Sequence, residues 1–162
     1  MAGQGVMVRA GTILIAITCL SARTLRAGDL QAVLIDASYA RPVRFNAGAS
    51  LFFSKQKDLK NSPADEGGSG VIVGGSVGAG GMKTWGGLQA LHPFGGDVRF
   101  VVTRTWDQPR ASDEATYLGG EVGWGGLGLR LSAGYGKRVG GAATAPDHIV
   151  TWGVGVAIPR FK

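Results

Sequence analysis

Apolar and polar residues alternate along most of the chain, and the alternation is clearest over residues 116–138. One face of this segment carries large apolar side chains, and the other carries glycines together with Glu121, Arg130 and Ser132. Period-two alternation is typical of β-strands, because successive side chains point to opposite faces. We therefore predict two strands on either side of the Gly-Gly pair at 125–126, since a tight hairpin turn favours glycine at both central positions.

The predicted hairpin has a testable register. A turn at 125–126 places Val122 opposite Leu129 and Glu121 opposite Arg130. Directly opposed residues share one face of a sheet, and a slip of one residue would move Arg130 to the apolar face. We therefore expect Glu121 and Arg130 to form a pair. If they do, replacing Glu121 alone should destabilise the protein more than replacing both residues by apolar ones.

Similar alternating runs of about ten residues fill the chain after residue 40. A Gly-Gly pair at 80–81 predicts a second hairpin, with Val77 opposite Thr84. The predicted strands cover residues 43–54, 70–79, 82–91, 97–106, the two halves of 116–138, and 148–158. An eighth strand over residues 29–40 has the weakest alternation. The alternative for this segment is an extension of the strand that begins at Val43.

Glycine changes the interpretation of these strands. It accounts for 29 of the 162 residues, well above the usual ~7%, and it lies mostly opposite the large apolar residues. Strands with one large apolar face and one small face fit a narrow barrel with lipid outside, and about ten residues can cross a bilayer. The predicted fold is an all-β, antiparallel, up-and-down transmembrane β-barrel of about eight strands. The alternative is a soluble β-sandwich or lipocalin-like barrel, whose outer face should be charged and rich in threonine.

The N-terminus predicts export. Residues 1–27 are typical of a signal peptide: a basic start is followed by an apolar run that is too short to span a bilayer as a helix. The expected cleavage is after Ala22 or Ala27, which leaves residues 28–162 as the barrel domain. A buried helix is the alternative. Cys19, the single cysteine, would be removed with the signal peptide, so neither disulfides nor thiol chemistry are expected.

Charge and motifs narrow the possible functions. The net charge of +6 falls to about +3 after cleavage at Ala27, and the remaining basic residues are scattered, so we expect no nucleic-acid binding. His92 and His148 have no partners at ligand spacing, which argues against a metal site. We find no nucleophile elbow and no phosphate-binding loop. No serine stands two residues after His148, which argues against lipid hydrolysis. We therefore expect no catalytic residues, metal or cofactor.

Four charged residues are assigned to the inner face of the barrel: Glu121, Arg130, Arg99 and Arg44. A charge in a narrow lumen needs a partner, because unpaired burial costs several kcal/mol. The four residues are therefore predicted to form a polar network in the lumen. Such a network either fills the barrel as a structural element or acts as a gate for ions.

The whole pattern resembles the small outer-membrane β-barrels of Gram-negative bacteria, of the eight-stranded type. The resemblance covers roughly residues 30–162 and rests on the signal-like start, the Gly-Gly hairpins and aromatic residues near strand ends. These predicted interface aromatics are Trp106, Tyr117, Trp124, Tyr135 and Trp152. The resemblance implies a monomer in the outer membrane, in contact with its lipid and inserted by the barrel-assembly machinery. The C-terminus departs from the family pattern, since Lys162 follows Phe161.

The sequence therefore predicts an integral outer-membrane barrel without catalytic activity, in a structural, surface-contact or narrow-pore role. Two alternatives belong to other classes. One is a secreted soluble barrel or sandwich that binds an apolar ligand or a protein partner, and the other is a barrel enzyme that acts on lipid. The sidedness of the loops stays open, because a C-terminus in the periplasm would place the long segment 55–69 there as well.

Overall fold

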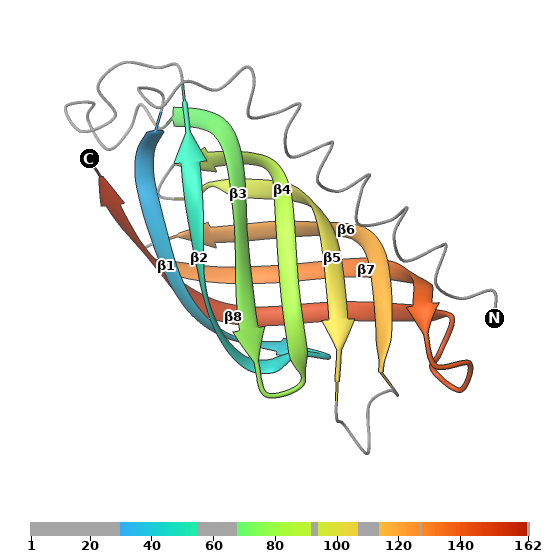
Figure 1. Ribbon diagram of the computed structural model, residues 1–162. Helices are drawn as coiled ribbons and strands as arrows, with labels where there is room; N and C mark the ends of the chain where they lie inside the picture. Colours follow the sequence, from blue (N-terminus) through green and yellow to red (C-terminus); the bar gives the residue numbers. More distant parts are fainter. Residues whose placement is uncertain (1–29, 55–67, 92–93, 107–113, 127, 162) are drawn as a thin grey trace.

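The computed structural model describes residues 30–54, 68–91, 94–106, 114–126 and 128–161. These residues form a closed barrel of eight antiparallel strands, each paired with its neighbours in the sequence (Figure 1). The strands are β1 (Leu30–Arg41), β2 (Arg44–Phe53), β3 (Gly68–Gly78), β4 (Gly81–Leu91), β5 (Gly96–Thr105), β6 (Ala115–Gly126), β7 (Leu129–Gly141) and β8 (His148–Phe161). The predicted all-β, up-and-down barrel is confirmed. The predicted signal peptide, residues 1–27, lies outside the described residues. Among the described residues there is no helix that is long and apolar enough to cross a membrane.

The weakest predicted strand closes the barrel. Residues 30–41 form β1, which is separated from β2 by a turn at residues 42–43 rather than continuous with it. Proline at position 42 suits a turn, because it has no backbone N–H to donate to a ladder. On its other side β1 pairs with β8, from Ala32 opposite Phe161 to Arg41 opposite Trp152. Closure leaves no unpaired strand edge in the sheet.

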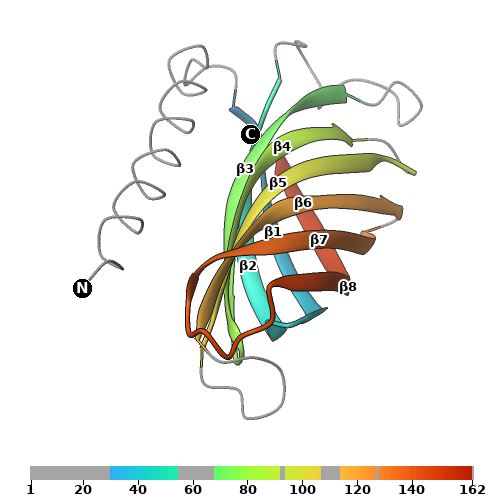
Figure 2. The same cartoon turned by 90° about the vertical axis from the view of Figure 1, so that its right-hand side faces the viewer.

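The barrel has two distinct ends, which the side views show (Figures 1 and 2). We call the end with the start of β1 and the end of β8 the terminal end, and the opposite end the loop end. The terminal end carries the connections from β2 to β3, β4 to β5 and β6 to β7, and the loop end carries the other four. The long connection over residues 54–67 therefore shares the terminal end, and loop length does not distinguish the two sides.

Both predicted hairpin turns are displaced. In the β6–β7 hairpin Gly126 pairs with Leu129, so the turn comes after Gly126, and Glu121 is opposite Gly134 instead of Arg130. Gly128 has φ 87°, which favours glycine. Gly125 instead serves close strand contact, because a Cβ there would lie 2.3 Å from the carbonyl oxygen of Leu129.

The turn of the β3–β4 hairpin is also displaced from its predicted position. Its turn lies at residues 79–80, and Val77 is opposite Met82 rather than Thr84. In both hairpins the observed partner of a residue lies an even number of positions from the predicted partner. The described residues of these hairpins therefore keep the faces that the alternation predicts, because facing alternates with period two.

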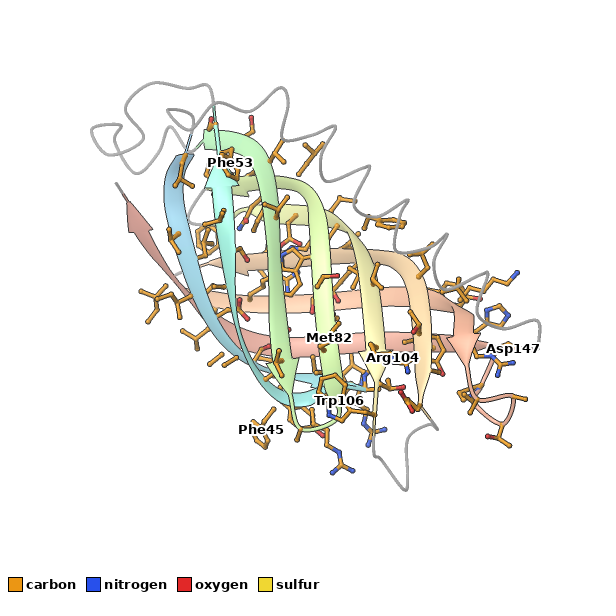
Figure 3. The ribbon with its side chains drawn as sticks, viewed as in Figure 1. Phe45, Phe53, Met82, Arg104, Trp106 and Asp147 are labelled. Carbon is orange, nitrogen blue, oxygen red and sulfur yellow. The ribbon has the colours of Figure 1, made fainter. Side chains whose placement is uncertain are left out.

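Large apolar side chains cover the outside of all eight strands. Phe45 and Val150 are 75% and 73% exposed, and the others include Ile35, Val77, Met82, Leu88, Val98, Phe100, Leu118, Val122, Leu131, Val154, Val156 and Ile158. Figure 3 shows Phe45, Met82, Arg104 and Trp106 toward one end of the barrel and Phe53 at the other. The buried residues include many polar ones, among them Lys83, Asp97, Arg99 and Glu121. The usual arrangement of an apolar inside and a polar outside is thus inverted.

Close strand packing makes Gly119 a test of the inner wall. An added Cβ would lie 1.9 Å from the carbonyl oxygen of Tyr135, whereas a Cβ at Gly140 would meet nothing within 4 Å. We expect Gly119→Ala to lower the free energy of unfolding by about 1–3 kcal/mol, as overpacking does. Gly140→Ala should have little effect. Urea unfolding of both variants measures the difference, and equal midpoints would contradict the observed packing of β6 on β7.

Candidate functional site

The largest polar cluster of the described residues lies in the middle of the lumen. Inward positions of β4, β5, β6 and β7 contribute Lys83, Asp97, Arg99, Glu121 and Arg130, which we call the lumen network. Alternation on each strand directs these side chains inward, opposite the apolar outer residues. Four strands are therefore connected by side chains as well as by their backbone ladder.

Arg130 on β7 is the central cation. Its Nε and one terminal nitrogen donate to the two carboxylate oxygens of Asp97 at 2.9 and 2.8 Å, and the same terminal nitrogen lies 3.1 Å from Glu121 Oε1. To reach Asp97 on β5, the guanidinium passes over β6 at Gly123. A Cβ at Gly123 would lie 2.4 Å from Asp97 Oδ2 and 2.6 Å from the Arg130 nitrogen. The missing side chain thus makes room for the bidentate pair.

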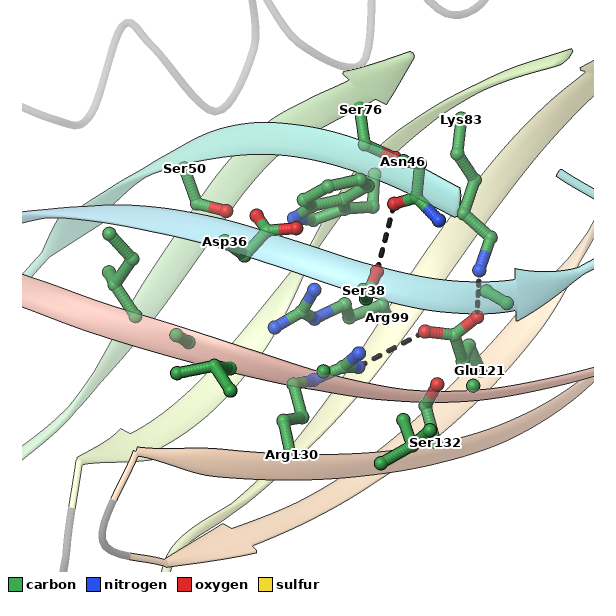
Figure 4. A pocket seen from close by; sticks show the side chains of 18 of the residues that line it. Asp36, Ser38, Asn46, Ser50, Ser76, Lys83, Arg99, Glu121, Arg130 and Ser132 are labelled. Carbon is green, nitrogen blue, oxygen red and sulfur yellow. Dashed lines mark hydrogen bonds and ion pairs between the residues drawn. The ribbon is translucent and has the colours of Figure 1, made fainter. Parts of the chain in front are cut away.

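Lys83 and Glu121 form the second strong contact. The Lys83 ammonium donates to Glu121 Oε2, and both side chains are nearly inaccessible to solvent. Glu121 therefore holds Lys83 with one oxygen and Arg130 with the other (Figure 4). Glu121 is the only ion-pair partner of Lys83 in the described part of the chain. Loss of Glu121 would leave that buried ammonium uncompensated.

Arg99 completes the network from β5. Its Nε lies 2.7 Å from Asp97 Oδ1 in ion-pair contact, and a terminal nitrogen donates to Asp97 Oδ2 at 3.3 Å. The guanidinium also lies over the ring of Trp85, 5.2 Å from the ring centroid. This arrangement is favourable because a cation is attracted to the face of an aromatic ring. Asp97 thus holds two arginines, and Trp85 supports one of them from β4.

A polar cavity of about 50 Å³ borders the network. Its other walls carry Asp36 and Ser38 from β1, Asn46 and Ser50 from β2 and Ser76 from β3 (Figure 4). The Ser38 hydroxyl donates to Asn46 Oδ1 at 2.9 Å. Asp36 makes no ion pair with any described residue. The cavity is large enough for a few water molecules and is too small for an organic ligand.

Apolar side chains lie on both sides of the charged layer. A cluster at the terminal end contains Ala32, Leu34 and Phe52, and a second cluster at the loop end contains Ala115, Tyr117 and Ala145, with Ile149 packed against it. Phe52 and Val43 are completely buried. Along its axis the lumen is therefore apolar, charged and again apolar, and side chains fill most of it.

The structure brings three of the four predicted network residues together in the lumen. Glu121, Arg130 and Arg99 meet in the lumen, although Glu121 and Arg130 contact diagonally rather than as directly opposed residues. The prediction for Arg44 is wrong. Arg44 is exposed at the first position of β2, with φ 63°, outside the network. Buried Val43 precedes it at the end of the lumen, so a residue at the strand start lies beyond the space that the network fills.

Of the predicted interface aromatics, some face outward and one faces the lumen. Trp124, Tyr135 and Trp152 face outward and are 58%, 53% and 46% exposed, and Trp106 is half-buried after β5. Tyr117 is wrong as an interface residue, because it is 1% exposed and faces the lumen. Its position is an even number of residues from Glu121, so the alternation of the strand places both side chains on the inner face.

Three residues of the site were missed, although the pattern contained a signal for two of them. Lys83 lies on the small, polar face of its strand, and Asp97 stands two residues before Arg99, so both share the inward facing. Asp36 lies in the strand with the weakest alternation, and only the closed barrel turns it toward the cavity. No feature of the sequence indicated which cation each carboxylate would choose.

Comparison with known proteins adds no relative. No protein-family model, curated protein or solved structure matches the chain. Among the described residues, no three histidine, cysteine or acidic side chains are grouped so that they could hold a metal ion. The arrangement of the lumen network is that of a brace between strands, since each carboxylate engages two cations.

Removing one carboxylate should expose this dependence. We expect Glu121→Gln to lower the free energy of unfolding by about 3–5 kcal/mol, because Lys83 then stays buried without a counter-charge. The double variant Lys83→Met/Glu121→Gln should recover part of that loss, since no lone ammonium remains. Urea unfolding of the two variants and of Lys83→Met alone completes the cycle. Strictly additive effects would contradict the coupling of Lys83 to Glu121.

Proposed function

We propose that this protein is an integral outer-membrane β-barrel of a Gram-negative bacterium, with a structural or surface-contact role. One observation carries the proposal: the described barrel is apolar outside and charged inside. Exposed side chains such as Phe45, Val150 and Leu88 would face water in a soluble protein, at a cost of about 25 cal/mol for each Å² of apolar surface. In a bilayer the same surface faces hydrocarbon.

The backbone supports the same environment. A closed barrel pairs its strand backbone groups internally, which spanning a bilayer requires. The eight strands contain 10 to 14 residues each, and about 9–11 tilted residues are enough to cross. Closure also leaves no free edge for pairing with a second copy, which favours a monomer. Insertion would then depend on the barrel-assembly machinery, as the resemblance implies.

The filled lumen favours a structural role over transport. Ion pairs cross the middle of the barrel, apolar clusters lie toward both ends, and the polar cavity measures about 50 Å³. A solute could pass only if Arg130 and Lys83 left their carboxylates. The barrel would therefore act as a rigid anchor that presents its loop end. A narrow pore is the second candidate, supported by the polar cavity beside the network.

The other two classes find less support. An apolar ligand of a secreted barrel would need an apolar lumen, whereas the described lumen contains three acidic and three basic side chains: Asp36, Asp97, Glu121, Lys83, Arg99 and Arg130. For lipid chemistry, His148 faces outward and contacts the Tyr135 hydroxyl, with Asp147 already paired to Arg138. We propose no catalytic role for these residues.

Fractionation of cells that express the chain tests the membrane proposal. We expect the protein in the outer-membrane fraction after a urea wash, with release only by detergent. Unheated samples should migrate differently from boiled ones on a denaturing gel, because a closed barrel resists unfolding by detergent. Recovery of the folded protein from the soluble fraction without detergent would refute the proposal.

Conductance separates the two roles within the membrane. Because side chains fill the lumen, we expect the purified barrel to show no steady conductance in planar bilayers at neutral pH. A large barrel of known conductance, reconstituted in parallel, controls for insertion. Steady single-channel steps from this protein would favour the narrow pore and overturn the structural role.

A further inference from the structure

Most charged residues at outward positions of the described strands lie at the loop end of the barrel. Within the described ranges, the charged residues at outward strand positions are Arg41, Arg104 and Lys137 at the loop end and Arg160 at the terminal end. Arg41 ends β1, Arg104 is the second-last residue of β5, and Lys137 is opposite His148, the first residue of β8. Exposed Arg44 begins β2 at the same end. In the described strands, the loop end of the outer wall thus carries most of the charged positions, and the middle of the wall carries none.

Not all of these cations are available to a partner. Arg104 is paired with Glu114 and donates to the Thr116 hydroxyl at 2.9 Å. In contrast, Arg41, Arg44 and Lys137 are exposed and form no ion pair with any carboxylate in the described part of the chain. We call these three residues the basic collar. It carries three positive charges that no described carboxylate compensates.

Aromatic rings lie beside the collar on the outer wall. The ring of Tyr39 on β1 lies 5.0 Å from that of Phe45 on β2 and 5.8 Å from that of Trp152 on β8. Arg41 is directly opposite Trp152. Aromatic side chains and long basic side chains both favour the boundary between hydrocarbon and headgroups, because one part of each is apolar and the other polar. The collar therefore lies at the height where headgroups would begin.

We propose that the basic collar binds the phosphate groups of anionic lipid headgroups in the leaflet at the loop end. This inference rests on the proposed function, since the barrel must lie in a bilayer. A guanidinium forms paired hydrogen bonds with phosphate oxygens, and a basic side chain near an anionic surface favours association by about five-fold. A soluble acidic partner would contact the loops instead, whereas Arg41 lies opposite Trp152 on the wall. The collar thus selects anionic lipid in the leaflet at the loop end.

Two tryptophans make the proposal testable at both ends of one molecule. Trp152 is exposed near the collar, and Trp124 is exposed near the terminal end. The variant Trp106→Phe/Trp124→Phe keeps Trp152 as its outward indole, and Trp106→Phe/Trp152→Phe keeps Trp124. Trp85 stays in the lumen of both variants. Each is reconstituted in phosphatidylcholine vesicles that contain acyl-brominated phosphatidylglycerol or acyl-brominated phosphatidylcholine, and fluorescence quenching gives the relative association of each lipid.

At Trp152 we expect brominated phosphatidylglycerol to associate about five-fold more strongly than brominated phosphatidylcholine, as one headgroup contact predicts. The preference should fall in 1 M salt, where charges are screened over about 3 Å. Trp124 should show no preference. In the Trp152 reporter, Arg41→Gln/Arg44→Gln/Lys137→Gln should abolish it. Arg104→Gln/Glu114→Gln removes a compensated pair and should leave it intact.

The remaining outcomes would contradict either the basic collar or the membrane location. Equal association of both lipids at Trp152, a preference that survives the triple substitution, or an equal preference at Trp124 would overturn the collar. The proposed function fails separately if neither brominated lipid quenches either tryptophan, since the barrel is then outside the bilayer. If the triple variant does not fold, the single variants Arg41→Gln and Lys137→Gln are measured instead, and the collar requires each to reduce the preference.

Discussion

Pairing of β1 with β8 is the constraint on which the rest of the structure depends. Before closure the sheet has two faces, and after it the faces become an outside and an inside. The inside is narrow, so it accepts few large side chains, and a charge that it encloses without a partner is costly. The glycines of the inner face and the paired ions of the lumen network are two consequences of the same limited space.

The lumen network shows how this space is used. Because Gly123 has no side chain, Arg130 can reach across β6 to Asp97. Glu121 binds Lys83 with one carboxylate oxygen and Arg130 with the other. Strands that are three apart in the ladder are thereby tied together through the interior. Such bracing stiffens the barrel from inside, where a soluble protein would have an apolar core.

The apolar outer wall is the counterpart of this charged interior. The outer wall is apolar around all eight strands, and the basic collar and a cluster of aromatic rings lie together at its loop end. The proposed membrane location explains the apolar part, and the proposed headgroup contact explains why charge returns at the loop end. Anchoring in the membrane would then follow from the distribution of side chains on the wall.

Sequence alone determined which way each side chain faces. Period two is local, so it identified the barrel and placed Glu121, Arg130 and Arg99 together, and consistent use of it would have turned Tyr117 and Lys83 inward. The tertiary structure decided the strand register, the ion-pair partners in the lumen and the positions of residues at the ends of the barrel. Both turns moved by steps that leave facing unchanged, so the alternation could not detect them. Arg44 left the lumen because the barrel ends there, and Asp36 faces the cavity because closure brings β1 beside β8.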